Sequence, residues 1–103
     1  MKYCMIETAF DNQEELNKVV DEILKNKIVG SCQIVESNSK WNWENTLEES
    51  KEYLLFMKTK KTLVNEIYDT IKNFHSYKCF EFAIFDLNSC NEDYLNWIET
   101  ETK

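Results

Sequence analysis

The middle third of the chain, residues 29–61, constrains the fold most strongly. Gly30 is the only glycine in 103 residues and is expected to close a helix before a strand leads out. The chain passes the indole pair Trp41 and Trp43 and a run of acids, and then returns through its most apolar segment, Tyr53–Met57. This pattern predicts a long β-hairpin with an apolar inner half and a polar outer half. Two indoles on a polar hairpin indicate that another chain covers them.

Residues 3–30 predict a strand followed by a helix. Tyr3–Thr8 has the period of two that is typical of a strand, with Cys4, Ile6 and Thr8 on one face and Tyr3, Met5 and Glu7 on the other. Asn12 and Glu15 have the spacing of a capping box at a helix start. The helix then carries one apolar stripe, formed by Leu16, Val19, Val20, Ile23 and Leu24.

Residues 62–103 predict a second helix, a fourth strand and a short closing helix. Thr62 is expected to cap the second helix, whose inner face carries Leu63, Ile67, Ile71 and Phe74. The strand is expected over Lys78–Phe85 and to be covered on both faces, since both are largely apolar. Either Ser89 or Asn91 starts the closing helix.

The order β-α-β-β-α-β with a terminal helix predicts one α+β domain over residues 1–103. Right-handed crossovers place both main helices on one face of a four-stranded sheet, which is the ferredoxin-like split βαβ sandwich. The other face of the sheet carries apolar residues as well. We expect self-association to cover it.

Composition excludes several classes of partner. All 12 basic residues are lysine, and the net charge is −7. Without arginine, and with a charge that repels phosphates, nucleic-acid binding is not expected. No apolar run is long enough to span a membrane, and Met1–Ala9 does not resemble a signal peptide. The expected location is therefore the cytoplasm, without membrane contact.

Catalytic signatures are weak in this sequence. There is one histidine, no Cys-x-x-Cys pair and no glycine-rich phosphate loop, so we do not expect an enzyme. The hairpin carboxylates Glu44, Glu48, Glu49 and Glu52 are expected to be a solvated edge.

Soft metal donors are present but form no known ligand spacing. They are Cys4, Cys32, Met57, His75 and Cys79, a set that favours copper, especially Cu(I), or zinc. The alternative for three of the cysteines, Cys4, Cys32 and Cys79, is a role as small buried residues on strands, with Cys90 exposed in a loop. The alternative for His75 is a hydrogen-bonded turn residue.

Four segments resemble motifs of the CutA-type divalent-ion tolerance family, in the same order. Ser31-Cys32-Gln33-Ile34 resembles the family's Ala-Cys-Val-Asn-Ile, and Trp41-Asn42-Trp43-Glu44-Asn45 resembles its Tyr-x-Trp-x-Gly turn. Residues 75–81 resemble His-Pro-Tyr-Glu-x-Pro-Glu, and residues 91–97 resemble Asn-x-x-Tyr-x-x-Trp. Lys58-Thr59 also ends the third strand as in the family. The departures are Asn45 at the turn glycine and Ser76 and Phe80 at the two prolines.

This resemblance implies a compact homotrimer similar to PII-type signalling proteins, assembled through the hairpin 31–60 and the sheet edges. It implies tolerance or binding of copper or another divalent metal ion. By the same resemblance, the metal contacts are expected at Cys32, His75 and Glu81. An inter-subunit cleft is expected to contain Trp43, Lys58, Tyr77 and Trp97. The alternative is a PII-like sensor or scaffold without a metal role, in which Lys58 holds a small anion.

Overall fold

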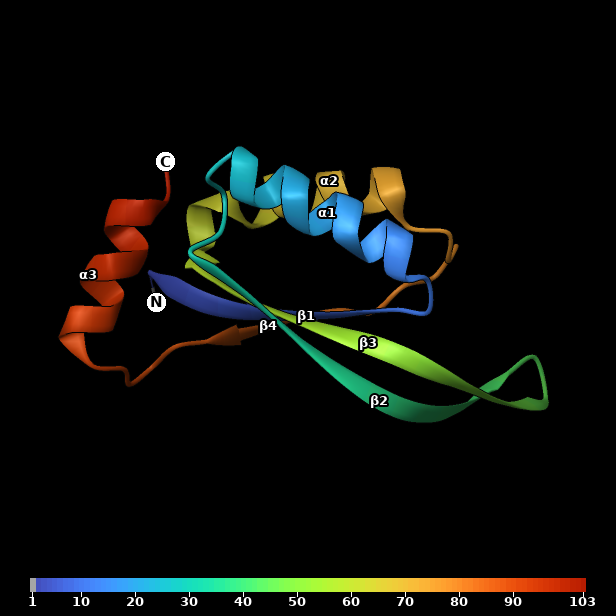
Figure 1. The fold of residues 1–103 in the computed structure, drawn as a ribbon. Helices are drawn as coiled ribbons and strands as arrows, with labels where there is room; N and C mark the ends of the chain where they lie inside the picture. Colours follow the sequence, from blue (N-terminus) through green and yellow to red (C-terminus); the bar gives the residue numbers. More distant parts are fainter. Residues whose placement is uncertain (1) are drawn as a thin grey trace.

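The computed structural model describes residues 2–103, which fold around one four-stranded antiparallel sheet. Its strands are β1 (Tyr3–Phe10), β2 (Ser31–Trp43), β3 (Thr46–Lys60) and β4 (Phe82–Asp86), in the spatial order β2-β3-β1-β4. Helices α1 (Gln13–Lys25) and α2 (Val64–Phe74) lie on one face of the sheet (Figure 1). The ferredoxin-like α+β prediction is confirmed.

The core lies between the sheet and these two helices. On β1, Cys4, Ile6, Thr8 and Phe10 alternate with the residues of the other face and are fully buried. From the helices, the predicted inner positions Leu16, Val19, Ile23, Ile67 and Ile71 are buried against them. Leu24 is the exception in the predicted stripe, with 44% of its surface exposed.

The two ends of α1 follow the prediction only in part. Asn12 Oδ1 accepts the Glu15 N–H at 3.0 Å, as predicted, but the Glu15 carboxylate accepts the backbone N–H of Ser76 instead of completing the capping box. At the other end Lys27, with φ of 56°, is the left-handed residue. The N–H groups of Lys27 and Ile28 donate to Leu24 and Ile23, which is a Schellman motif.

Gly30 is therefore needed for space and not for helix termination. Its N–H donates to the Lys58 carbonyl at 2.8 Å. A Cβ at this position would lie 3.3 Å from the same oxygen and 3.4 Å from both Trp97 and Ile98. Helix α3 (Glu92–Glu101) packs against the chain at Gly30, and the contact that a side chain there would make tight is the one with the Lys58 oxygen.

The hairpin of β2 and β3 extends beyond the rest of the sheet, as Figure 1 shows. Pairing of β3 with β1 ends at Tyr53 and Phe10, so residues 37–52, here called the arm, pair only with each other. Glu44 and Asn45 connect the strands as a two-residue turn with φ of 48° and 65°. These angles are those of a type I′ turn, which confirms a turn at Asn45.

Two element boundaries differ from the prediction. A 3-10 turn, Lys61–Leu63, follows β3 directly, and α2 begins at Val64 without a side-chain cap from Thr62. Strand β4 begins at Phe82 and not at Lys78, because Phe82 pairs with Thr8 close to the end of β1 and residues 78–81 have no ladder partner. The cover expected on both faces of this strand is incomplete in one chain, since Ile84 and Phe85 remain 46% and 50% exposed.

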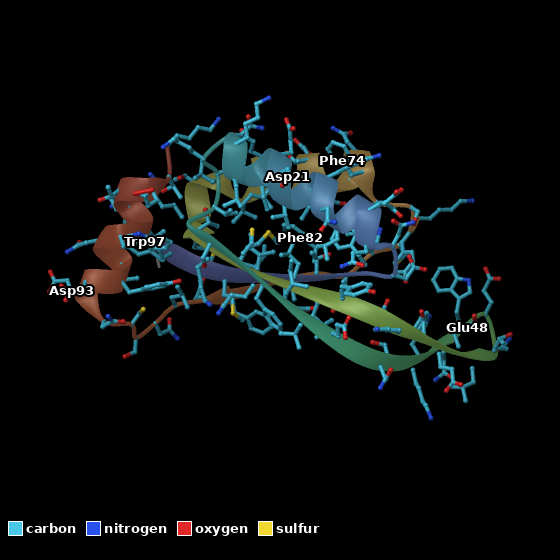
Figure 2. All side chains as sticks on the ribbon, viewed as in Figure 1. Asp21, Glu48, Phe74, Phe82, Asp93 and Trp97 are labelled. Atoms are coloured by element: carbon cyan, nitrogen blue, oxygen red, sulfur yellow. The ribbon has the colours of Figure 1, made fainter. Side chains whose placement is uncertain are left out.

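The second face of the sheet is here called the open face. Its half-exposed apolar residues are Met5, Val35, Leu54, Phe56 and Phe85. Helix α3 lies at one end of the molecule and the arm at the other, where Figure 2 shows Trp97 and Glu48. The Glu99 carboxylate anchors α3 by accepting the Tyr3 hydroxyl at 2.7 Å and by pairing with Lys2 and Lys60.

The cysteines follow the prediction only in part. Cys4 is buried and Cys32 is half-buried, each on a strand, and all four are free thiols. Cys79 is exposed and lies before β4, because that strand starts later than predicted. Cys90 is half-buried and not exposed. Within residues 2–103, no helix is long and apolar enough to cross a membrane.

Candidate functional site

A cleft of about 830 Å³ lies between the arm and the segment that precedes β4. One wall comes from the arm and carries both indoles, and the other wall comes from residues 77–81. Its lining residues are Ala9, Asn38, Ser39, Lys40, Trp41, Trp43, Glu52, Tyr77, Lys78, Cys79, Phe80 and Glu81. Three residues predicted for the site, Trp43, Tyr77 and Glu81, are therefore brought together.

Glu52 lies beneath this cleft and is the hairpin carboxylate whose environment differs most from the prediction. It was expected to be solvated, yet it is only 6% exposed. The Tyr77 hydroxyl donates to its Oε2 at 3.0 Å. Burial, followed by this hydrogen bond to a carboxylate, raises the pKa of Tyr77 above its ordinary value. The phenol is therefore a donor that links the arm to the segment after α2.

Glu7 and Glu81 add two further carboxyl groups near Glu52. Burial raises the pKa of Glu7 to about 7, and the hydrogen bond and charge of Glu81 and the charge of Glu52 act in the same direction. Sequence reasoning did not single out Glu7. Its position on β1 between the buried Ile6 and Thr8 was the available signal, since alternation places it on the open face.

The other predicted cleft residues, Lys58 and Trp97, lie at the opposite end of the open face. Both lie next to Gly30. The Lys58 ammonium donates to the side-chain oxygen of Gln33. Trp97 stacks on Tyr94 with ring centroids 5.6 Å apart, and the Tyr94 hydroxyl is 3.2 Å from that of Ser31. Within one chain the residues expected in the cleft therefore lie in two separate groups, one at the arm end of the open face and one at the α3 end.

The three expected metal contacts are not gathered in one chain. Cys32 lies opposite Met57 and so on the helix-facing side of the sheet, whereas Glu81 is exposed in the cleft. Burial raises the pKa of the Cys32 thiol to about 12, so the sulfur keeps its proton at neutral pH, and the thiolate is the ligand form. Both His75 ring nitrogens are bonded to backbone groups, at Ala9 and Tyr77. Within residues 2–103 no group of three or more His, Cys, Asp or Glu side chains could hold a metal ion.

Comparison with known proteins gives the family of this chain. The family model of the CutA1 divalent ion tolerance protein matches residues 4–101. The chain belongs to the CutA1 divalent ion tolerance family. The match contains both ends of the open face, the arm and α3.

Relatives of the CutA1 family extend over almost the same length. The divalent-cation tolerance protein CutA of Pyrococcus horikoshii is 33% identical over 99 residues, which are 96% of this chain and 97% of that protein. That of Thermococcus kodakarensis is 31% identical over 98 residues, or 95% and 94%. The crystal structure of Pyrococcus horikoshii CutA1 has a TM-score of 0.90 and covers 97% of this chain and 98% of that one, at 33% identity. The fold and the family are thus established together.

Proposed function

We propose that this protein contributes to tolerance of divalent cations, as the names of its CutA relatives indicate, and that it does so by binding and not by catalysis. The observation that carries the proposal is the CutA1 match over residues 4–101. The surroundings of His75 argue against a histidine-activated nucleophile, because its two nitrogens contact the backbone groups of Ala9 and Tyr77.

We further propose that the working form is a homotrimer. Half-exposed apolar residues line the open face, and such a face is stabilised when a second protein surface removes it from water. The number of three subunits is what the family resemblance implies. In a ring, the α3 end of one chain, with Lys58 and Trp97, would meet the arm end of the next, with Trp43 and Tyr77.

Copper is the metal that we propose, and the cytoplasm is the proposed compartment. Four free thiols fit a reducing compartment. Thiolate and thioether sulfur favour Cu(I), and Cys32 lies opposite Met57 on the neighbouring strand. The donors of one chain do not form a site, so any such site would require a second chain or rearrangement. The alternative of an anion sensor would use Lys58, whose ammonium donates to the side-chain oxygen of Gln33.

Native mass spectrometry of the reduced protein during graded Cu(I) addition tests this function. We expect a trimer that takes up copper saturably, and a Cys32→Ser variant that takes up less, because serine removes the sulfur donor. Cys90→Ser is the matched control, since Cys90 lies in the loop before α3 and should leave uptake unchanged.

Three outcomes would contradict the proposal. A trimer that binds no copper would be consistent with the fold but would refute the proposed copper binding. Equal loss of copper in the two serine variants would show that uptake reflects thiols in general and not the Cys32 position. A monomer would refute the assembly.

A further inference from the structure

His75 has its full hydrogen-bonding capacity occupied by the backbone. Its Nε2 lies 2.6 Å from the carbonyl oxygen of Ala9, and its Nδ1 accepts the N–H of Tyr77 at 3.2 Å. A carbonyl oxygen can only accept, so Nε2 must carry the hydrogen. The ring is therefore the neutral Nε2–H tautomer, and its single lone pair, on Nδ1, already has a donor.

Both faces of the imidazole are also covered. Phe10 stacks on one side with centroids 4.2 Å apart and planes at 13°. Phe80 stacks at 4.9 Å and 11°, and Tyr77 lies tilted at 4.8 Å. A metal ion reaches an imidazole through a nitrogen lone pair in the ring plane. Metal coordination here would therefore break the Tyr77 bond and disturb the stack.

Two of the residues that contact His75, Tyr77 and Phe80, belong to the wall of the cleft formed by residues 77–81. Residues 75–81 have no ladder partner and are held by separate contacts with the rest of the fold. Ser76 donates to Glu15, the Tyr77 hydroxyl donates to Glu52, and the Glu81 carbonyl accepts from Thr8. His75 is the member that joins β1 to both Tyr77 and Phe80.

We propose that His75 is a positioning residue that fixes this wall, and that metal bound by the protein does not contact its imidazole. This departs from the ligand role that the family resemblance implied. The positioning role of His75 applies already to the metal-free protein. The proposal does not depend on whether copper is the metal. Since His75 is the only histidine, its ring nitrogens give one unambiguous pair of NMR signals.

The first test is the ¹⁵N spectrum of the ring in the whole, reduced protein. We expect a protonated Nε2 and an unprotonated Nδ1 without metal, and the same two shifts after addition of Cu(I) or of Zn²⁺. The Nδ1–H tautomer, or a shift of either nitrogen in step with metal uptake, would overturn the proposal. A protein that takes up no metal would refute the proposed function but leave the tautomer and the variants below to decide this inference.

The second test uses His75→Phe and His75→Gln to distinguish a role in positioning the cleft wall from a general contribution to the stability of the fold. Phenylalanine keeps the stack and removes both hydrogen bonds, whereas glutamine offers an amide N–H and an amide oxygen. We expect Tyr77 amide exchange to accelerate roughly tenfold in the Phe variant, as for loss of one hydrogen bond, and to recover partly in the Gln variant. Exchange at Leu16 in α1 should not change, and copper stoichiometry should equal that of the wild type.

Unchanged Tyr77 exchange in a folded His75→Phe variant would refute the positioning role. Loss of copper from that variant, with the fold and the trimer intact, would instead restore the histidine as a ligand.

Discussion

At the scale of the residue, the partners of a side chain decide its chemistry in this protein. Cys32 and His75 have the atoms that bind soft metals, yet one is a half-buried, protonated thiol and the other is a neutral ring bonded to the backbone. Glu99 shows the opposite case, because one carboxylate accepts from Tyr3 and pairs with Lys2 and Lys60. These contacts hold its pKa at about 2, below the ordinary value of 4.5.

Glu99→Gln should therefore destabilise the fold at neutral pH and make its stability less dependent on acid. A carboxyl with a lowered pKa in the folded state stabilises that state above pH 4.5, and the contribution is lost as the pH falls from 4.5 through 2. We expect the stability difference between wild type and Glu99→Gln to be full at pH 6 and to vanish towards pH 2. Urea unfolding across this range measures it.

Glu101→Gln is the matched control, because Glu101 is exposed at the end of the same helix. A stability difference between wild type and Glu99→Gln that does not change with pH would show that the Glu99 contacts act through packing and not through charge.

At the scale of the element, the arm shows how a hairpin can continue without a core beneath it. Its 16 residues, 37–52, pair only with each other and receive support at Glu52 from Tyr77. The turn residues Glu44 and Asn45 both have positive φ, where residues other than glycine are strained. Asparagine tolerates this region better than most side chains do, which explains why it can replace the family's glycine.

Asn45→Gly should stabilise the hairpin and Asn45→Val should destabilise it. Glycine removes the strain of a left-handed φ at little steric cost, whereas a β-branched side chain increases it by about 1–2 kcal/mol. We expect the urea midpoint to rise in the first variant and fall in the second. Valine substitution at the neighbouring Thr46, where φ belongs to the strand, is the control and should have little effect. Equal effects at both positions would contradict the turn type.

At the scale of the whole molecule, the sheet has one face covered by helices and one that carries only α3 at its end, within residues 2–103. The chain measures 44 by 27 by 21 Å, and its long dimension comes from the arm. The half-exposed apolar side chains of the open face lie between the two groups of predicted cleft residues. Association through this face would unite the groups and cover the apolar surface in one step.

Phe85→Glu should dissociate the assembly while leaving the fold intact. Phe85 is 50% exposed in one chain, so a charge there is tolerated by the monomer but is costly to bury in an interface. Sedimentation velocity should show a smaller species than the wild type, with unchanged circular dichroism. Leu24→Glu is the matched control, since Leu24 is 44% exposed but lies on α1. Dissociation by the control, or an intact assembly in Phe85→Glu, would contradict an interface at the open face.

The sequence by itself determined the order of the elements and the inner faces of both helices, and the family resemblance of residues 41–45 located the turn at Asn45. These depend on local periodicity and on φ preferences, which are properties of neighbouring residues. Only the tertiary structure decided where β4 begins, because a strand needs a partner and the pairing with β1 ends at Thr8 and Phe82. The same holds for Gly30, whose role depends on Lys58 and on α3, and for Glu52, whose burial depends on Tyr77. It also holds for His75: its residue type suggests a ligand, but distant contacts with Ala9 and Phe10 occupy the ring.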